Sequence, residues 1–254
     1  MQTQLRDNYI RKQMRGVTGY LRRLDATIIS TLLGWQENNG VKGNLCEIGV
    51  HHGRLFLILA LSRREKETSV AIDLFEDDDI NTGEHAGRAG ALLNNAKRLN
   101  IQLSADEVMK GSSMDLTPAD ILKHAGGPIR FFSVDGGHMY EHVENDLKLA
   151  KACMSEGGII AVDDFFNLRW SEVSFATYDF LRVNPEYVPC LATNTKLYLV
   201  DRKYASKVLQ SFKSTPPAGM NSSSPIRFLG SDIFVMTDSR VSTVRKLASK
   251  LIKV

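Results

Sequence analysis

The chain has 254 residues, of which 43% are hydrophobic, and a formal net charge of +3. This length and composition allow one substantial core, and no apolar run approaches the length that crosses a bilayer, so we expect a globular, cytoplasmic protein without membrane contact. Its three cysteines are odd in number and lack metal-ligand spacing, so buried free thiols in a reducing compartment are the simplest account.

The positive charge is concentrated at one end of the chain. Residues 203–254 contain nine lysines and arginines against two aspartates, so residues 1–202 are mildly acidic. A basic segment can bind nucleic acid or anionic lipid. Here the basic residues are dispersed and no aromatic-rich RNA-binding motif accompanies them. We therefore expect a solvated face and no nucleic-acid partner.

The first 40 residues are predicted to form helices, because apolar side chains recur at helical spacing over residues 21–35. We expect this segment, residues 1–40, to act as a lid or as a contact in a homo-oligomer. From residue 44 onward, strands and helices alternate. The predicted strands are 45–48, 69–73, 107–109, a strand from 129, 157–162, 187–192 and 196–200, and the predicted helices are 55–61, 84–100, 118–124, 138–154 and 173–181.

This alternation predicts a Rossmann-like, doubly wound α/β fold with a mostly parallel, seven-stranded sheet and an antiparallel hairpin at one edge. We assign residues 41–202 to this domain. Residues 203–254 form a basic C-terminal extension that contains a loop at 214–225, a strand at 226–236 and an amphipathic helix from 241 to 252. We expect the extension to pack on the domain or on a partner subunit.

A glycine-containing loop follows the first strand of this domain and reads Glu47-x-Gly49-x-x-x-Gly53. The two glycines let the backbone turn tightly near a ligand, and Asp73, at the end of the second strand, is placed to accept hydrogen bonds from a ribose. The pattern predicts a nucleoside held across the first two strands, although ordinary strand-to-helix turns are the alternative. The spacing is wrong for a dinucleotide fingerprint, which disfavours a nicotinamide oxidoreductase.

Carboxylates follow the next two strands of the predicted sheet. Asp135 ends the strand from residue 129, and Asp163 and Asp164 end the strand 157–162. Because parallel strands end at one edge, these side chains and His138 should converge there. Such a group suits a hard cation such as Mg²⁺ and a proton acceptor. The alternatives are that Asp135 caps the helix after it and that the aspartate pair forms a strand-end turn.

His138 is expected on the first turn of the helix 138–154, three residues after Asp135. His142 and Asp146 follow it at intervals of four, and we expect them to form a surface ladder instead of a catalytic relay.

Together these motifs resemble the class I S-adenosylmethionine-dependent methyltransferases over roughly residues 40–202. Within that superfamily the chain is most similar to the metal-dependent O-methyltransferases of sugars and natural products. The resemblance rests on Glu47-x-Gly49-x-x-x-Gly53, Ala71-Ile72-Asp73-Leu74-Phe75, Gly111-Ser112-Ser113, Val134-Asp135-Gly136-Gly137-His138-x-Tyr140 and Gly157-Gly158-x-Ile160-x-x-Asp163-Asp164.

The resemblance implies S-adenosylmethionine as cofactor and assigns its contacts. Glu47 and Gly49 would lie near the methionine moiety, Asp73 would hold the ribose, Leu74 would flank the nucleoside, and Ser112 and Ser113 would border the adenine. Gly53 and Asp135 would also contact the cofactor. Ser112 stands where the family often has an acid. Some sugar methyltransferases carry an acid where this chain has Gly137, which favours His138 as the base.

We therefore predict transfer of a methyl group to a hydroxyl of a small polyhydroxylated acceptor, either a sugar or a phenolic natural product. A divalent cation, Mg²⁺ or a similar hard ion, would be held by Asp135, Asp163 and Asp164, with His138 as general base. Asn167 and Trp170 would form the substrate wall. Two alternatives stay open: a metal-independent N- or O-methyltransferase, and a catalytically silent, nucleoside-binding regulatory protein.

Overall fold

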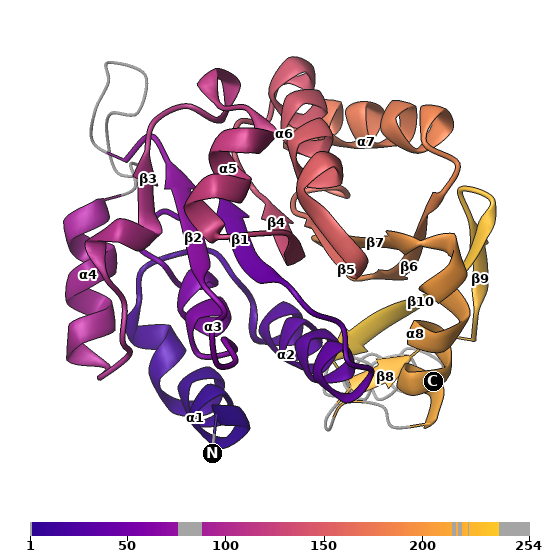
Figure 1. Ribbon diagram of the computed structural model, residues 1–254. Coiled ribbons are helices and arrows are strands. Elements are labelled where there is room, and N and C mark those ends of the chain that lie inside the picture. The colour runs from indigo at the N-terminus through magenta and orange to yellow at the C-terminus, as the bar shows by residue number, and fades with distance from the viewer. Residues whose placement is uncertain (1, 76–87, 215–216, 218–219, 223, 239–254) are drawn as a thin grey trace, which may run out of the picture.

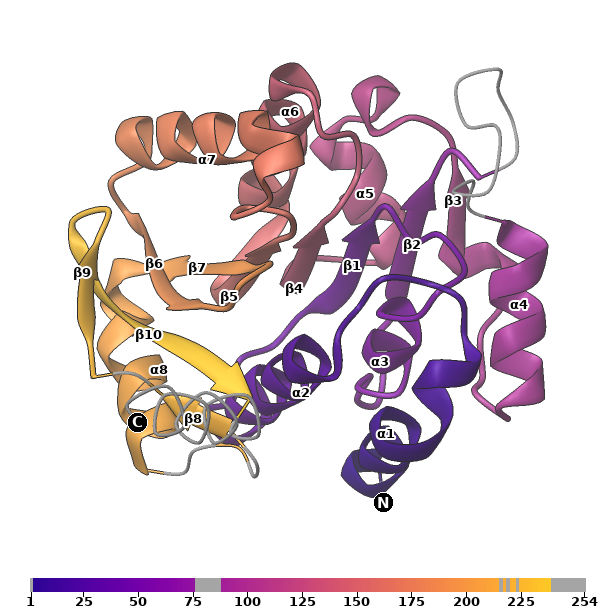
Figure 2. The same ribbon diagram turned by 180° about the vertical axis from the view of Figure 1, so that it is seen from behind.

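The computed structural model describes residues 2–75, 88–214, 217, 220–222 and 224–238. Over these residues, helices cover both faces of one twisted sheet (Figures 1 and 2). The described strands number ten, in the order β3-β2-β1-β4-β5-β7-β6-β10-β8, with β9 paired to β10. They are β1 (Asn44–Ile48), β2 (Ser69–Asp73), β3 (Val108–Lys110), β4 (Ile129–Val134), β5 (Met154–Val162), β6 (Tyr187–Ala192), β7 (Leu197–Asp201), β8 (Met220–Ser222), β9 (Ile226–Phe228) and β10 (Ser231–Asp238).

Two groups of helices enclose this sheet. Helices α2, α3, α4 and α8 lie on one face, and α5, α6 and α7 lie on the other (Figure 1). Their apolar side chains contribute to two separate core clusters, one on each face. The helices are α1 (Gln2–Asn8), α2 (Arg23–Asn38), α3 (Phe56–Ala60), α4 (Ala89–Arg98), α5 (Pro118–Ala125), α6 (Tyr140–Cys153), α7 (Ser171–Val183) and α8 (Arg202–Ser214). Within the described part of the chain, none of them is long and apolar enough to cross a membrane.

The α/β class and the mostly parallel sheet are confirmed, whereas the number of strands was predicted wrongly. The predicted seven strands are present, but β8, β9 and β10 extend the sheet beyond them. Because β10 pairs parallel to β6, the antiparallel β6–β7 hairpin lies inside the sheet and not at its edge. The single strand expected at 226–236 is instead two strands, β9 and β10, joined through Leu229 and Gly230, both with positive φ. The helix expected from 241 to 252 lies outside the described residues.

The register of the parallel strands sets the position of the candidate site. Ile48 of β1 is paired with Ile72 of β2 and with Val134 of β4, and Val134 is paired in turn with Val162 of β5. The residues that follow these strands therefore form a row along one edge of the sheet. Gly49, Asp73, Asp135 and Asp163 occupy that row.

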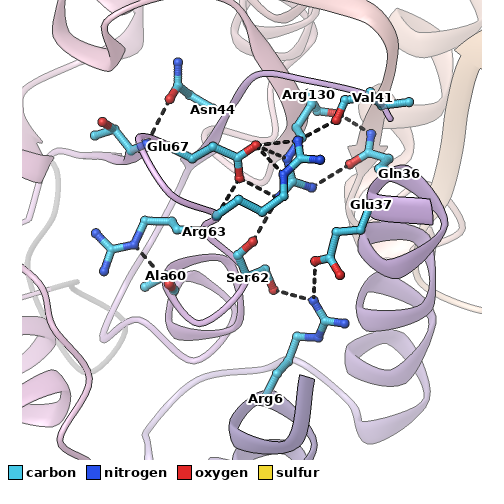
Figure 3. Close-up of polar contacts among 12 residues, drawn as sticks. Arg6, Gln36, Glu37, Val41, Asn44, Ala60, Ser62, Arg63, Glu67 and Arg130 are labelled. Carbon is cyan, nitrogen blue, oxygen red and sulfur yellow. Dashed lines mark hydrogen bonds and ion pairs between the residues drawn. The ribbon is translucent and has the colours of Figure 1, made fainter. Parts of the chain in front are cut away.

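A buried polar network lies near the opposite end of the same strands (Figure 3). Arg130, at the start of β4, is fully buried, and its guanidinium donates two hydrogen bonds to Glu67, of 3.0 and 2.9 Å, and one of 3.0 Å to Gln36 of α2. Arg6 of α1 donates to Glu37 and Ser62. Arg130 thus pairs with Glu67 and Arg6 with Glu37, and the network joins α1 and α2 to the sheet.

Candidate active site

A cavity of about 1280 Å³ opens at the carboxyl ends of the parallel strands. Every predicted site residue except Glu47 and Gly53 lines it. The loops after β1 to β5 contribute to the wall, as do the β6–β7 turn and the segment just before α2. The cavity thus joins the predicted nucleoside end, at Asp73, to the predicted acidic end, at Asp164.

The two glycines of the first loop have different roles in the structure. Gly49 has φ of +85°, and a Cβ placed there would lie 1.6 Å from the carbonyl oxygen of Asp135, so only glycine allows β1 and β4 to end this close together. A Cβ at Gly53 would instead meet Leu92 of α4 at 2.3 Å. Gly53 therefore serves helix packing behind the cavity.

Glu47 is also behind the cavity wall. It is 2% exposed, and its Oε2 has no hydrogen-bond partner among the described residues. Burial raises the pKa of Glu47 well above its usual value. Its predicted contact with the cofactor stays a prediction.

At the nucleoside end, the backbone fixes the orientation of Asp73. Its Oδ2 accepts a hydrogen bond of 2.7 Å from the backbone N–H of His51, and its Oδ1 accepts one of 2.7 Å from that of Phe75. Each carboxylate oxygen keeps further acceptor capacity, which a ribose diol could use. Leu74, Ser112 and Ser113 line the same part of the cavity.

At the acidic end, the structure groups Asp135, His138 and Asp164. One ligand atom from each lies within 4.8 Å of the other two. Nε2 of His138 is 3.1 Å from Oδ2 of Asp164, and Asn167 donates a hydrogen bond of 3.0 Å to Oδ1. Burial alone would raise the pKa of Asp164, but the hydrogen bonds from His138 and Asn167 lower it below its usual value. Asp164 is thus held as a carboxylate that faces the imidazole.

Backbone and ring geometry fix this pair. Asp164 has φ of +54°, a conformation that costs energy in a residue other than glycine and turns its side chain toward His138. Trp170 stacks on the imidazole, with ring centroids 4.6 Å apart and an interplanar angle of 17°. His138 itself lies in the loop before α6, which begins at Tyr140, so its expected place on the first helical turn was wrong.

The expected surface ladder on α6 was also wrong. Asp146 is fully buried, and its carboxylate lies beneath Gly136, where a Cβ would be 2.6 Å from Oδ2. Burial raises the pKa of Asp146 to about 6. His142 lines the cavity, one turn closer to the start of the helix.

Asp163 points to a partner that was not predicted. Its Oδ2 is 2.5 Å from the Nζ of Lys196, and its Oδ1 accepts a hydrogen bond of 2.9 Å from the backbone N–H of Asp164. Burial alone would lower the pKa of Lys196, but the nearby carboxylates, Asp163 foremost, raise it above its usual value. Burial, reinforced by the charge of Asp163, raises the pKa of Asp135 well above its usual value.

Comparisons with known proteins agree with this geometry. Residues 46–165, which run from within β1 to just after β5 and include the aspartate pair, match the family model of a methyltransferase domain. The fold is that of the O-methyltransferase NovP, with a TM-score of 0.57 at 16% identity over 70% of this chain and 79% of that one. Residues 46–165 thus match a methyltransferase domain, and the fold is one that O-methyltransferases share.

Three further proteins are similar to this chain in fold or in sequence. CalS11, a TDP-rhamnose 3'-O-methyltransferase of calicheamicin biosynthesis, gives a TM-score of 0.54 at 17% identity over 78% of this chain and 92% of that one. TomG from Streptomyces achromogenes, solved with S-adenosylmethionine, gives 0.51 at 12% identity over 79% and 87%. An uncharacterized protein, R132, of Acanthamoeba polyphaga mimivirus is 34% identical over 86 residues, which span 34% of this chain and 39% of that protein.

Two residues of the candidate site, Lys196 and Asp25, were missed by the sequence reasoning. Both line the cavity although both are about 1% exposed. A signal for Asp25 existed, because this acid lies among the apolar positions of the helix at 21–35. Lys196 directly follows a turn and precedes a buried strand, and only the antiparallel pairing of β7 with β5 brings it opposite Asp163.

Proposed function

We propose that this methyltransferase transfers the methyl group of S-adenosylmethionine to a hydroxyl of a small polyhydroxylated acceptor, a sugar or a phenolic compound. The observation that carries the proposal is the pairing of His138 with Asp164 in the same cavity as Asp73. A proton acceptor there would face the methyl end of a cofactor whose ribose lies on Asp73. The similarity in fold to NovP and CalS11 supports oxygen as the receiving atom.

A residue of the chain can accept the proton that the acceptor hydroxyl loses. A neutral alcohol is a poor nucleophile near pH 7, so its proton must leave as the new carbon–oxygen bond forms. When Nε2–H of His138 donates to Asp164, Nδ1 carries the lone pair and can accept that proton. The bond between the methyl carbon and sulfur breaks at the same time, and S-adenosylhomocysteine leaves as a neutral thioether. Trp170 holds the imidazole plane through stacking.

A divalent cation fits the donor set at this end of the cavity. Two carboxylates and an imidazole within 4.8 Å are ligands that Mg²⁺ or Mn²⁺ accepts, and Asp135 and Asp164 would hold the ion. Such an ion would lower the pKa of the acceptor hydroxyl and hold a neighbouring oxygen.

The mouth of the cavity favours an acceptor that carries an apolar or aromatic body beside its hydroxyl. Large apolar side chains that line the cavity stay exposed there: Phe166 at 40%, Leu168 at 97% and Trp170 at 37%, together with Met114 and Tyr20. A group of exposed apolar side chains at a site is typical of ligand contact. Asn167, between Phe166 and Leu168, supplies a polar contact in the same loop.

A metal-independent version of the same reaction is the second candidate. It is favoured by one observation: each member of the aspartate pair already has a basic partner, Lys196 for Asp163 and His138 for Asp164. Turnover that is unchanged after treatment with EDTA would select this version.

The test is transfer of a labelled methyl group from S-adenosylmethionine to a panel of sugars and phenols, for the wild type, His138→Ala and His138→Asn. Asparagine can still donate a hydrogen bond to Asp164 but cannot accept a proton as a base. We expect both variants to lose roughly 10²–10⁴-fold in kcat while cofactor affinity changes little. Full turnover by His138→Asn would show that His138 is not the base. If the wild type methylated no acceptor, the alternative of a catalytically silent, nucleoside-binding protein would be favoured.

A further inference from the structure

Lys196 places a positive charge inside the methyltransferase site. Its side chain is 1% exposed, and its ammonium is 2.5 Å from one oxygen of Asp163. A buried ammonium this close to a carboxylate forms a permanent pair, since loss of either partner would leave an uncompensated charge. Asp163 therefore already has a cation.

The protein holds Lys196 in place through its backbone. The side-chain oxygen of Thr193 accepts hydrogen bonds from the backbone N–H of Lys196, at 2.9 Å, and of Thr195, at 3.2 Å. The hydroxyls of Thr193 and Thr195 donate to the two oxygens of the buried Asp25, at 2.6 and 3.0 Å. Since Asp25 belongs to the first turn of α2, these hydrogen bonds join the turn that contains Lys196 to α2.

The turn that carries the aspartate pair is joined to the same structure. The backbone N–H of Phe165 donates to the carbonyl of Thr195 at 3.1 Å, and that of Asp163 donates to the carbonyl of Val134 at 3.0 Å. Lys196 and Asp163 are thus held against each other from both sides.

We propose that Lys196 is a positioning residue that keeps Asp163 out of the divalent-cation site, so that only Asp135 and Asp164, beside His138, would hold the ion. The argument rests on the proposed function, in which the site takes a cation. A metal ion on Asp163 would lie next to the buried ammonium, and two positive charges repel strongly where water is excluded. The site should consequently bind cations more weakly than a site with three carboxylates.

The test is Mn²⁺ titration followed by electron paramagnetic resonance of the free ion, which needs no substrate and no turnover. In the wild-type background we expect Asp163→Asn to change Mn²⁺ affinity less than twofold, and Asp164→Asn to lower it about tenfold or more. An equal loss in the two variants would overturn the inference, because Asp163 would then be a ligand.

A variant that removes the charge of Lys196 tests whether Asp163 becomes a metal ligand when its ion-pair partner is absent. Lys196→Met keeps an unbranched side chain that is one atom shorter and uncharged, which frees Asp163, so Mn²⁺ affinity should rise about tenfold or more. Lys196→Arg should bind Mn²⁺ as the wild type does. The gain should disappear in the double variant Lys196→Met with Asp163→Asn. Unchanged or weaker binding by a folded Lys196→Met, or no binding by either protein, would overturn the inference. Failure of the proposed function would appear separately, in the methylation assay.

Discussion

Replacing Asp146 with asparagine should stabilise the protein at neutral pH and leave its stability unchanged in acid. Asp146, on α6, is fully buried, and one of its carboxylate oxygens has no hydrogen-bond partner among the described residues. Burial raises its pKa from 3.8 to about 6, while contacts with Ser113, Asn145 and His142 only partly offset the effect. At about 1.4 kcal/mol per pH unit, ionising this carboxyl costs the folded state about 3 kcal/mol.

The sign of the pH dependence follows from the raised pKa. The folded state holds the proton of Asp146 more tightly than the unfolded state does, so this residue lowers the free energy of unfolding as the pH rises from about 4 to about 6. Below about pH 4 both states are protonated and the penalty vanishes; above about 6 it is present in full.

Urea unfolding of wild type and Asp146→Asn between pH 4 and 8 measures this difference. We expect the variant to gain about 1–3 kcal/mol at pH 7.5 and close to nothing at pH 4. The control is Glu144→Gln on the same helix, where an exposed acid pairs with Lys148 and the change should stay below about 0.5 kcal/mol at either pH. A variant that is less stable than the wild type at pH 7.5, or whose gain does not depend on pH, would refute the reasoning.

Three further predictions concern the cavity. Gly49→Ala should lower the free energy of unfolding, measured in urea, by more than about 2 kcal/mol, because its Cβ would collide with Asp135. Gly40→Ala is the control: Gly40 also has a positive φ, but nothing lies within 4 Å of its Cβ, so the loss should be about 1 kcal/mol. Equal losses in the two variants would contradict the steric argument. Asp73→Asn should weaken S-adenosylmethionine binding roughly 10- to 100-fold, as measured by calorimetry. An amide cannot accept hydrogen bonds from both backbone N–H groups and also accept hydrogen bonds from a ribose. Unchanged affinity would show that Asp73 does not bind the cofactor. Trp170→Ala should raise the acceptor KM several-fold and leave cofactor affinity unchanged, and the opposite pattern would move Trp170 out of the acceptor wall.

The central strands could be predicted from the sequence because they are buried on both faces. The strand expected at 69–73 has the same bounds in the structure, since its apolar run is flanked by polar residues and ends in Asp73. Likewise, placing Asp135 and Asp164 after neighbouring parallel strands was enough to predict that they approach each other. Their roles in catalysis stay predictions.

The remaining features depend on contacts between distant segments. Local pattern cannot show that β10 joins β6, or that Lys196 lies opposite Asp163, because antiparallel pairing of β7 with β5 decides the second contact. The start of α6 was placed two residues too early, because nothing in the local sequence distinguishes the loop at His138 from a first helical turn. Asp146 was expected on the surface because its spacing was considered without the loop at Gly136 that covers it.

The most direct test of the account is calorimetric titration of the EDTA-treated protein with S-adenosylmethionine, for the wild type and Asp73→Asn. The account predicts binding of one cofactor per chain by the wild type and clearly weaker binding by the variant. No binding by a folded wild-type protein would contradict the assignment of the cavity to this cofactor.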